Sequence, residues 1–156
     1  MQKKQLVAWQ HMRYWAQRAY FGIASMFAAS IVVQVFLAGL NVFGQPRWWG
    51  THIQGGHWIG VLVLALVPLA FTGRFPHQIR WLTIVVFVLY GMQYNFRQLG
   101  ALFGVPQLAA LHAVNAVVLF WCATTLARQA WRIVRFTKME TTNAPARTTS
   151  TESPSA

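Results

Sequence analysis

Acidic side chains are almost missing from this 156-residue sequence, and their absence excludes several kinds of site. There is no aspartate, and the only two glutamates, Glu140 and Glu152, lie near the C-terminal end. The long apolar runs therefore carry no carboxylate, which argues against a proton pump or a transporter with a charged pathway. No phosphate-binding loop, zinc motif or nucleophile elbow is visible either.

Cysteine is nearly absent as well, because Cys122 is the only one. A single thiol excludes a disulfide within one chain. It also argues against a structural zinc site, which usually takes four cysteine or histidine ligands. Cys122 falls within an apolar run, where we expect it to pack as a small hydrophobic residue.

Apolar residues dominate the rest of the sequence. Hydrophobic residues make up 56% of the chain and charged residues only 10%, and the mean hydropathy is +0.39. Such a composition is typical of a membrane protein, and the runs are too continuous for the alternating strands of a β-barrel. We therefore predict an all-α membrane protein, a four-transmembrane-helix bundle with spans at residues 19–42, 55–72, 79–96 and 106–127.

The segments on either side of the bundle have a different character. Residues 1–18 mix aromatic and polar positions and predict a cytoplasmic or interfacial helix rather than a cleavable signal peptide. Residues 19–128 form the predicted bundle. Residues 129–156 begin as a basic segment and continue, from Thr137, as a stretch rich in Thr, Ser and Pro that predicts a disordered tail.

The cations are distributed very unevenly about the predicted spans. Of 13 lysines and arginines, only Arg47 and Arg97 fall on one side. The positive-inside rule then places both termini in the cytoplasm, with the chain integral to a bacterial cytoplasmic (inner) membrane. The net charge of +11 is thus explained by topology and by attraction to anionic lipid, and nucleic acid is not an expected partner.

Two histidines, His57 and His112, stand just inside the outer ends of the second and fourth predicted spans. An imidazole at membrane depth needs a partner, because hydrocarbon offers it no water. Gln34, Gln93 and Asn115 fall in the same outer half, with Asn115 one turn beyond His112. We interpret this layer of polar groups, drawn from all four spans, as a cofactor-binding site in the bundle core.

Haem b is the cofactor that this pair of histidines indicates best, with His57 and His112 as ligands to its iron. Imidazoles that face each other across a bundle commonly fill both axial positions of haem iron, whereas zinc usually has further ligands. A copper site on His52, His57 and His112 is one alternative, and hydrogen-bonded structural histidines are another. His11 and His77 fall on the cytoplasmic side and are not expected to enter the site.

Four further side chains complete the predicted site. Arg47 and Arg97 are expected either to pair with haem propionates or to remain solvated loop charges. Gln93 is expected to hydrogen-bond near the macrocycle or to donate to an axial imidazole. For Gln34, we weigh the same role against a simple bridge between helices.

The spans also resemble one half of haem A synthase, in which a histidine begins the second and fourth helices and the third helix carries a glutamine. The matching stretches are His-Trp-Ile-Gly at 57–60, Gly-Met-Gln at 91–93 and Ala-Leu-His-Ala-Val-Asn-Ala at 110–116. The run Gln-Val-Phe-Leu-Ala-Gly-Leu at 34–40 is similar to a family of small four-span bacterial proteins of unassigned function. Together the resemblances cover residues 19–128.

The resemblance implies a b-type haem held by His57 and His112, but it does not carry over the synthase reaction. Haem A synthase uses two bundles, and its first outer loop supplies an acidic residue and often a cysteine pair. Only one bundle is present here, and the loop at 43–56 contains no Asp, Glu or Cys.

The sequence leaves three classes of function to compare. The first is a cytochrome-like electron carrier rather than a stand-alone enzyme, because an iron with both axial positions filled suits electron transfer. Its expected partners are quinol, the subunits of a larger redox complex or a second copy of the chain. The second is a haem-free structural or assembly subunit of a membrane complex. The third, a small transporter or channel, is weaker because no inverted repeat is visible.

Overall fold

The computed structural model consists of four long helices joined by short turns. It describes residues 2–142, apart from the side chains at 3, 97, 106 and 137–142. The elements are α1 (Gln2–Phe43), α2 (Trp48–Thr72), α3 (His77–Leu102), the short 3-10 helix η1 (Pro106–Ala110) and α4 (Leu111–Thr142). Within the described residues there is no strand, so the prediction of an all-helical chain is confirmed.

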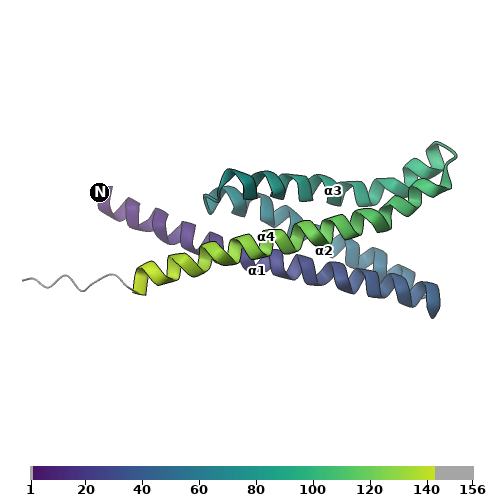
Figure 1. The fold of residues 1–156 in the computed structure, drawn as a ribbon, viewed down its shortest axis with the longest axis horizontal. Helices are drawn as coiled ribbons and strands as arrows, with labels where there is room; N and C mark the ends of the chain where they lie inside the picture. Colours follow the sequence, from purple (N-terminus) through teal and green to yellow (C-terminus); the bar gives the residue numbers. More distant parts are fainter. Residues whose placement is uncertain (1, 143–156) are drawn as a thin grey trace, which may run out of the picture.

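The helices run in alternate directions along one long axis, so α1 begins and α4 ends at the same end of the molecule (Figure 1). Helix α1 packs against α2 and α4, and α3 packs against the same two helices. The pairs α1/α3 and α2/α4 therefore lie diagonally across the bundle. A side chain of α2 can meet one of α4 only by reaching through the middle.

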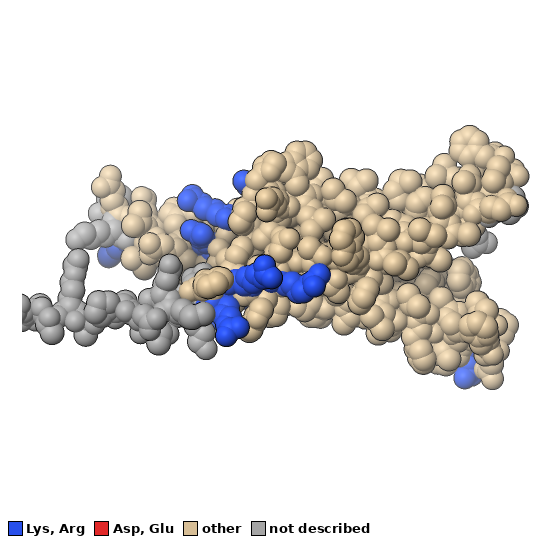
Figure 2. Space-filling view, in the orientation of Figure 1, with Lys and Arg blue, Asp and Glu red and all other residues tan. Residues whose placement is uncertain are grey.

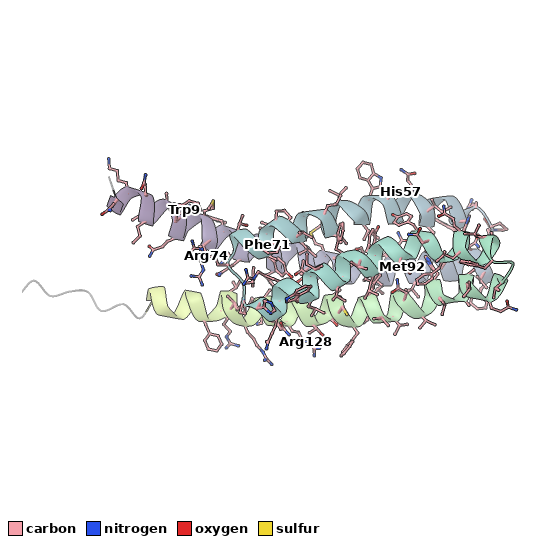
Figure 3. The ribbon with its side chains drawn as sticks, turned by 90° about the horizontal axis from the view of Figure 1, so that it is seen from above. Trp9, His57, Phe71, Arg74, Met92 and Arg128 are labelled. Carbon is pink, nitrogen blue, oxygen red and sulfur yellow. The ribbon has the colours of Figure 1, made fainter. Side chains whose placement is uncertain are left out.

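The two ends of the bundle differ in charge. Most of the described cations gather where α1 begins, α2 turns into α3 and α4 ends, and we call this the basic end (Figure 2). Arg74 and Arg128 lie toward it, whereas His57 lies in the other half of α2 (Figure 3). We call the opposite end, where α1 turns into α2 and α3 into α4, the cavity end.

Three of the described helices are long and apolar enough to cross a membrane: α1, α2 and α4. Helix α3 has 26 residues, which is sufficient length, but its last third carries Gln93, Asn95 and Gln98 and is less apolar. The structure thus has four long helices, and hydropathy alone identifies three of them as membrane spans.

Helix boundaries differ from the predicted ones in three places that matter. Helix α2 begins at Trp48 rather than at residue 55, so His52 is helical and not part of a loop. Helix α1 runs without a break through the predicted boundary at residues 18 and 19. Helix α4 continues to Thr142, into the predicted tail, and residues 143–156 lie outside the described part.

The hydrophobic core fills the half of the bundle nearer the basic end. Every helix contributes fully buried side chains there, among them Phe27, Leu66, Val86 and Leu126. Two buried polar contacts tie the helices together in this half. Gln17 of α1 donates to the backbone oxygen of Gly73 at 2.9 Å, and Tyr20 of α1 lies 2.6 Å from the hydroxyl of Thr83 in α3.

Candidate functional site

The cavity end holds a cavity of about 730 Å³ between the four helices. This volume falls within the range of about 300–1,000 Å³ that is common for small-molecule and cofactor sites. Its walls are mainly apolar, and a few polar side chains from all four helices reach it. These are Gln34 of α1, His52 and His57 of α2, Tyr90, Gln93 and Tyr94 of α3, and His112 of α4.

Two histidines from diagonally opposed helices meet inside this cavity. The ring centres of His52 in α2 and His112 in α4 are 6.1 Å apart, with the ring planes inclined by 58°. Both side chains are partly buried. The structure therefore places His52, and not the predicted His57, next to His112 across the bundle.

Each of these two rings is oriented by a backbone carbonyl of the helix that precedes it. His52 Nδ1 lies 3.0 Å from the carbonyl oxygen of Gln34, and His112 Nδ1 lies 3.0 Å from that of Gln93. A carbonyl oxygen can only accept a hydrogen bond, so Nδ1 carries the proton in both bonds. The other ring nitrogen, Nε2, is then left with a free lone pair.

The side-chain amide of Gln34 also contacts α2 next to His52. With its amide oriented to satisfy both atoms, Gln34 donates to the backbone oxygen of His52 and accepts from the backbone nitrogen of Gly56, both at 2.9 Å. Its amide nitrogen also lies 2.8 Å from His52 Nδ1. The amide nitrogen can donate to Nδ1 only when Nδ1 carries no proton, so the backbone carbonyl and the side-chain amide of Gln34 favour opposite tautomers of His52. A metal ion at Nε2 would favour the tautomer with the proton on Nδ1.

Gln93 and Asn115 join α3 to α4 beside His112. The Asn115 side chain is 7% exposed, and its amide nitrogen donates to Gln93 Oε1 at 2.7 Å and to the backbone oxygen of Leu89 at 2.8 Å. The predicted cluster of Gln93, His112 and Asn115 is thus present in space. Gln93 touches the imidazole through its backbone carbonyl rather than through its amide.

His57 is placed differently from the prediction. Its side chain is exposed, and its ring stacks on Tyr94 with centres 5.6 Å apart and planes inclined by 17°. Tyr94 lies 3.1 Å from the hydroxyl of Tyr90, which in turn bonds the backbone oxygen of Gly56. Because His57 and Tyr94 both line the cavity and are exposed, they stand at its mouth.

The two outer arginines have no described contact with the cavity. Arg47 is exposed, and its guanidinium lies 5.3 Å from the ring centre of Trp48. The side chain of Arg97 lies outside the described part of the chain. Arg47 thus packs on its neighbouring indole, and a contact of either arginine with a propionate stays a prediction.

A three-ligand copper site does not form among the described residues, since no group of three or more His, Cys, Asp or Glu side chains could hold a metal ion there. Two opposed imidazoles suit a metal that brings its own equatorial ligands. A porphyrin supplies four nitrogens, and haem proteins commonly complete the iron with histidine.

Sequence reasoning did not select His52, Tyr90 and Tyr94 for the predicted haem site. A signal for His52 does exist, because glutamine precedes histidine by 18 positions at Gln34 and His52 and by 19 at Gln93 and His112. The hairpins α1–α2 and α3–α4 thus repeat one arrangement, a helix carbonyl that orients an imidazole of the next helix.

Comparison with known proteins adds one match. A family of unknown function (DUF6220) matches residues 34–99, which include His52, His57 and Gln93 but not His112. No curated protein and no solved structure matches this chain.

Proposed function

We propose that this chain is an integral membrane protein that binds haem b between α2 and α4 and carries single electrons. The observation that supports this most is the placement of His52 and His112, with ring centres 6.1 Å apart across the bundle. Imidazole nitrogens bind first-row metals at about 2 Å, so two rings on opposite sides of one ion have centres about 6 Å apart.

The surroundings of the two rings also fit a haem. Each Nδ1 bonds a carbonyl, which is the usual way in which a metal-ligating histidine is held with its other nitrogen facing the metal. The cavity is largely apolar, so its walls would exclude water from a macrocycle. Bound haem would supply one-electron exchange at its iron, and two histidine ligands would leave no open position for oxygen chemistry.

We further propose that all four helices cross the bacterial inner membrane, with both termini in the cytoplasm and the cavity end toward the outer face. The cations at the basic end would then follow the positive-inside rule (Figure 2). Helix α3 would cross despite its polar last third, because Gln93 is bonded to α4 and Tyr90 to α2 rather than facing hydrocarbon unpaired.

Purification of the full chain in detergent after haem-supplemented expression tests the proposal through a reduced-minus-oxidised absorption spectrum. The wild type should show b-type bands. The variants His52→Ala and His112→Ala should each abolish or shift them, whereas His77→Ala, an exposed histidine of the basic end, should not. A colourless wild type would overturn the proposal and favour the haem-free accessory subunit.

His57→Ala distinguishes the two possible pairs of ligands in the same experiment. The bands should persist in this variant if His52 and His112 hold the iron. Their loss in His57→Ala, together with their persistence in His52→Ala, would restore the pair predicted from the sequence.

A further inference from the structure

His57 lies inside the proposed membrane, and the described residues offer its side chain no hydrogen-bond partner. It is nine residues beyond the start of α2, which places it about 14 Å along the helix from the end at Trp48. Its side chain is exposed, and its one described contact is the ring of Tyr94. An unpaired imidazole facing hydrocarbon is costly, so this position favours a ligand that bonds it.

The tyrosine and histidine side chains at the mouth of the cavity keep unused hydrogen-bond donors and acceptors. Tyr90 donates its only hydroxyl proton to the carbonyl oxygen of Gly56, because that oxygen can only accept. In the bond between the two phenols, Tyr94 must then be the donor. The oxygen of Tyr94 remains free to accept, and the ring of His57 offers one donor and one acceptor.

Apolar stripes lead from this mouth along the outside of the bundle. Val61 and Leu64 follow His57 at helical spacings of four and seven residues, and both are exposed. On α3, Phe87 precedes Tyr94 by seven residues and is also exposed. The two polar rings thus stand at the end of a lipid-facing track formed by α2 and α3, two helices in direct contact.

We infer that the mouth of the cavity binds the head group of a quinol, with the apolar tail lying along this track. A dihydroxy ring at the mouth can donate its hydroxyl protons to the imidazole nitrogen of His57 and to the free phenol oxygen of Tyr94. The reduced form fits better than the oxidised form, since a quinone has only acceptors. This inference rests on the proposed function, for which it names the class of electron donor.

Binding is tested with the full chain in nanodiscs under anaerobic conditions. The probe is a ubiquinol with a ten-carbon tail, and its binding is followed through quenching of the tryptophan fluorescence. The wild type should bind the quinol saturably and more tightly than the matching quinone. His57→Ala and Tyr94→Phe should each weaken quinol binding about tenfold, the effect of losing one hydrogen bond of about 1.4 kcal/mol.

Two controls separate a binding role from a structural one. His77→Ala and Tyr14→Phe, which change the same residue types at the basic end, should leave quinol binding unchanged. The melting temperature of His57→Ala should stay at the wild-type value, whereas Tyr94→Phe, which also loses the bond that Tyr94 donates to Tyr90, should stay folded and melt only slightly lower. Equal quinol affinity in all these proteins, or competition by a phosphatidylglycerol head group without any preference for quinol, would overturn the inference.

The absorption spectrum keeps this test independent of the haem proposal. If the wild type has no haem bands but loses quinol binding in His57→Ala, the binding site stands and the proposed function fails. If bands are present in every protein and quinol binding is the same in all of them, the proposed function stands and the quinol site fails.

Discussion

At the scale of residues, the imidazoles of His52 and His112 are oriented by main-chain atoms. Their Nδ1 partners are the carbonyl oxygens of Gln34 and Gln93, which belong to helix backbones. A substitution of either glutamine side chain leaves this carbonyl in place. The ring orientation is therefore most sensitive to whatever holds each pair of helices in register.

Asn115 holds α3 and α4 in register. The variant Asn115→Ala should destabilise the protein by about 1 kcal/mol, because buried oxygens of Gln93 and Leu89 lose their donor. It should also shift the haem absorption bands, since the carbonyl that orients His112 belongs to Gln93. Equilibrium unfolding and the absorption spectrum measure the two effects.

Asn95→Ala is the matched control for this prediction. Asn95 is exposed, and its amide nitrogen bonds only the backbone oxygen of Gly91 in its own helix. Its removal should change stability by less than about 0.5 kcal/mol and leave the spectrum unchanged. If both asparagine variants behave alike, Asn115 does not set the register of these helices.

At the scale of elements, the close approach of α1 to α2 depends on a glycine. A Cβ atom added at Gly55 would collide with the side-chain amide of Gln34, which is held between the backbones of His52 and Gly56. We expect Gly55→Ala to displace this amide, to cost about 1 kcal/mol of stability and to reduce haem occupancy.

Gly50→Ala, in the same helix, is the control, because a Cβ atom added there meets nothing within 4 Å. Alanine is the better helix former, so this variant should be neutral or more stable by up to about 1 kcal/mol. Thermal unfolding and the haem-to-protein ratio compare the two variants. Equal haem occupancy in both would show that the fit of α2 against Gln34 is not needed for the site.

Helix α1 extends well beyond the thickness of a membrane. Its 42 residues span about 63 Å, whereas a bilayer with its head groups measures about 40–45 Å. The N-terminal part, with exposed Trp9 and Trp15, therefore continues α1 without a break, and its position at the membrane surface stays a prediction. No glycine or proline interrupts residues 2–21, which explains why the helix does not break there.

At the scale of the whole molecule, the number of crossings can be measured by cysteine labelling. Native Cys122 is buried and should give little background. With four spans, Gln45→Cys and Leu102→Cys should react with a membrane-impermeant maleimide from outside intact spheroplasts, whereas Gln78→Cys should react only after lysis. Gln45 lies in the turn between α1 and α2, and Gln78 and Leu102 lie at the two ends of α3, next to the other two turns.

The outcome at Leu102→Cys decides between three and four spans. If α3 does not cross, this position and Gln78→Cys will be labelled on the same side. Labelling of all three positions from the same side would instead overturn the proposed topology altogether.

Much of this architecture could be predicted from hydropathy and charge, and the errors have physical causes. The clustering of Gln93, His112 and Asn115 follows from helical spacing. His52 lies outside the second predicted span because Gly50 and the polar residues around it lower both hydropathy and helix propensity, while contacts with α1 keep the segment helical.

The outward position of His57 could not be predicted in the same way. The direction of a side chain around a helix depends on how that helix is rotated against its neighbours, and this is set by packing. Gly60 is one determinant, because a Cβ atom there would lie 3.3 Å from the ring of Tyr90. Tyrosine is common at membrane surfaces, so Tyr90 and Tyr94 carried no signal of a site.

The separation of the packed core from the cavity has a consequence for biogenesis. The half of the bundle near the basic end is filled by side chains alone, including Phe27, Leu66 and Leu126, and needs no ligand to be complete. We therefore expect the chain to insert and fold first, and the haem that we propose to enter afterwards. Cells deprived of tetrapyrrole precursors should accumulate normal amounts of the empty, protease-resistant protein, which turns coloured once the precursor is restored.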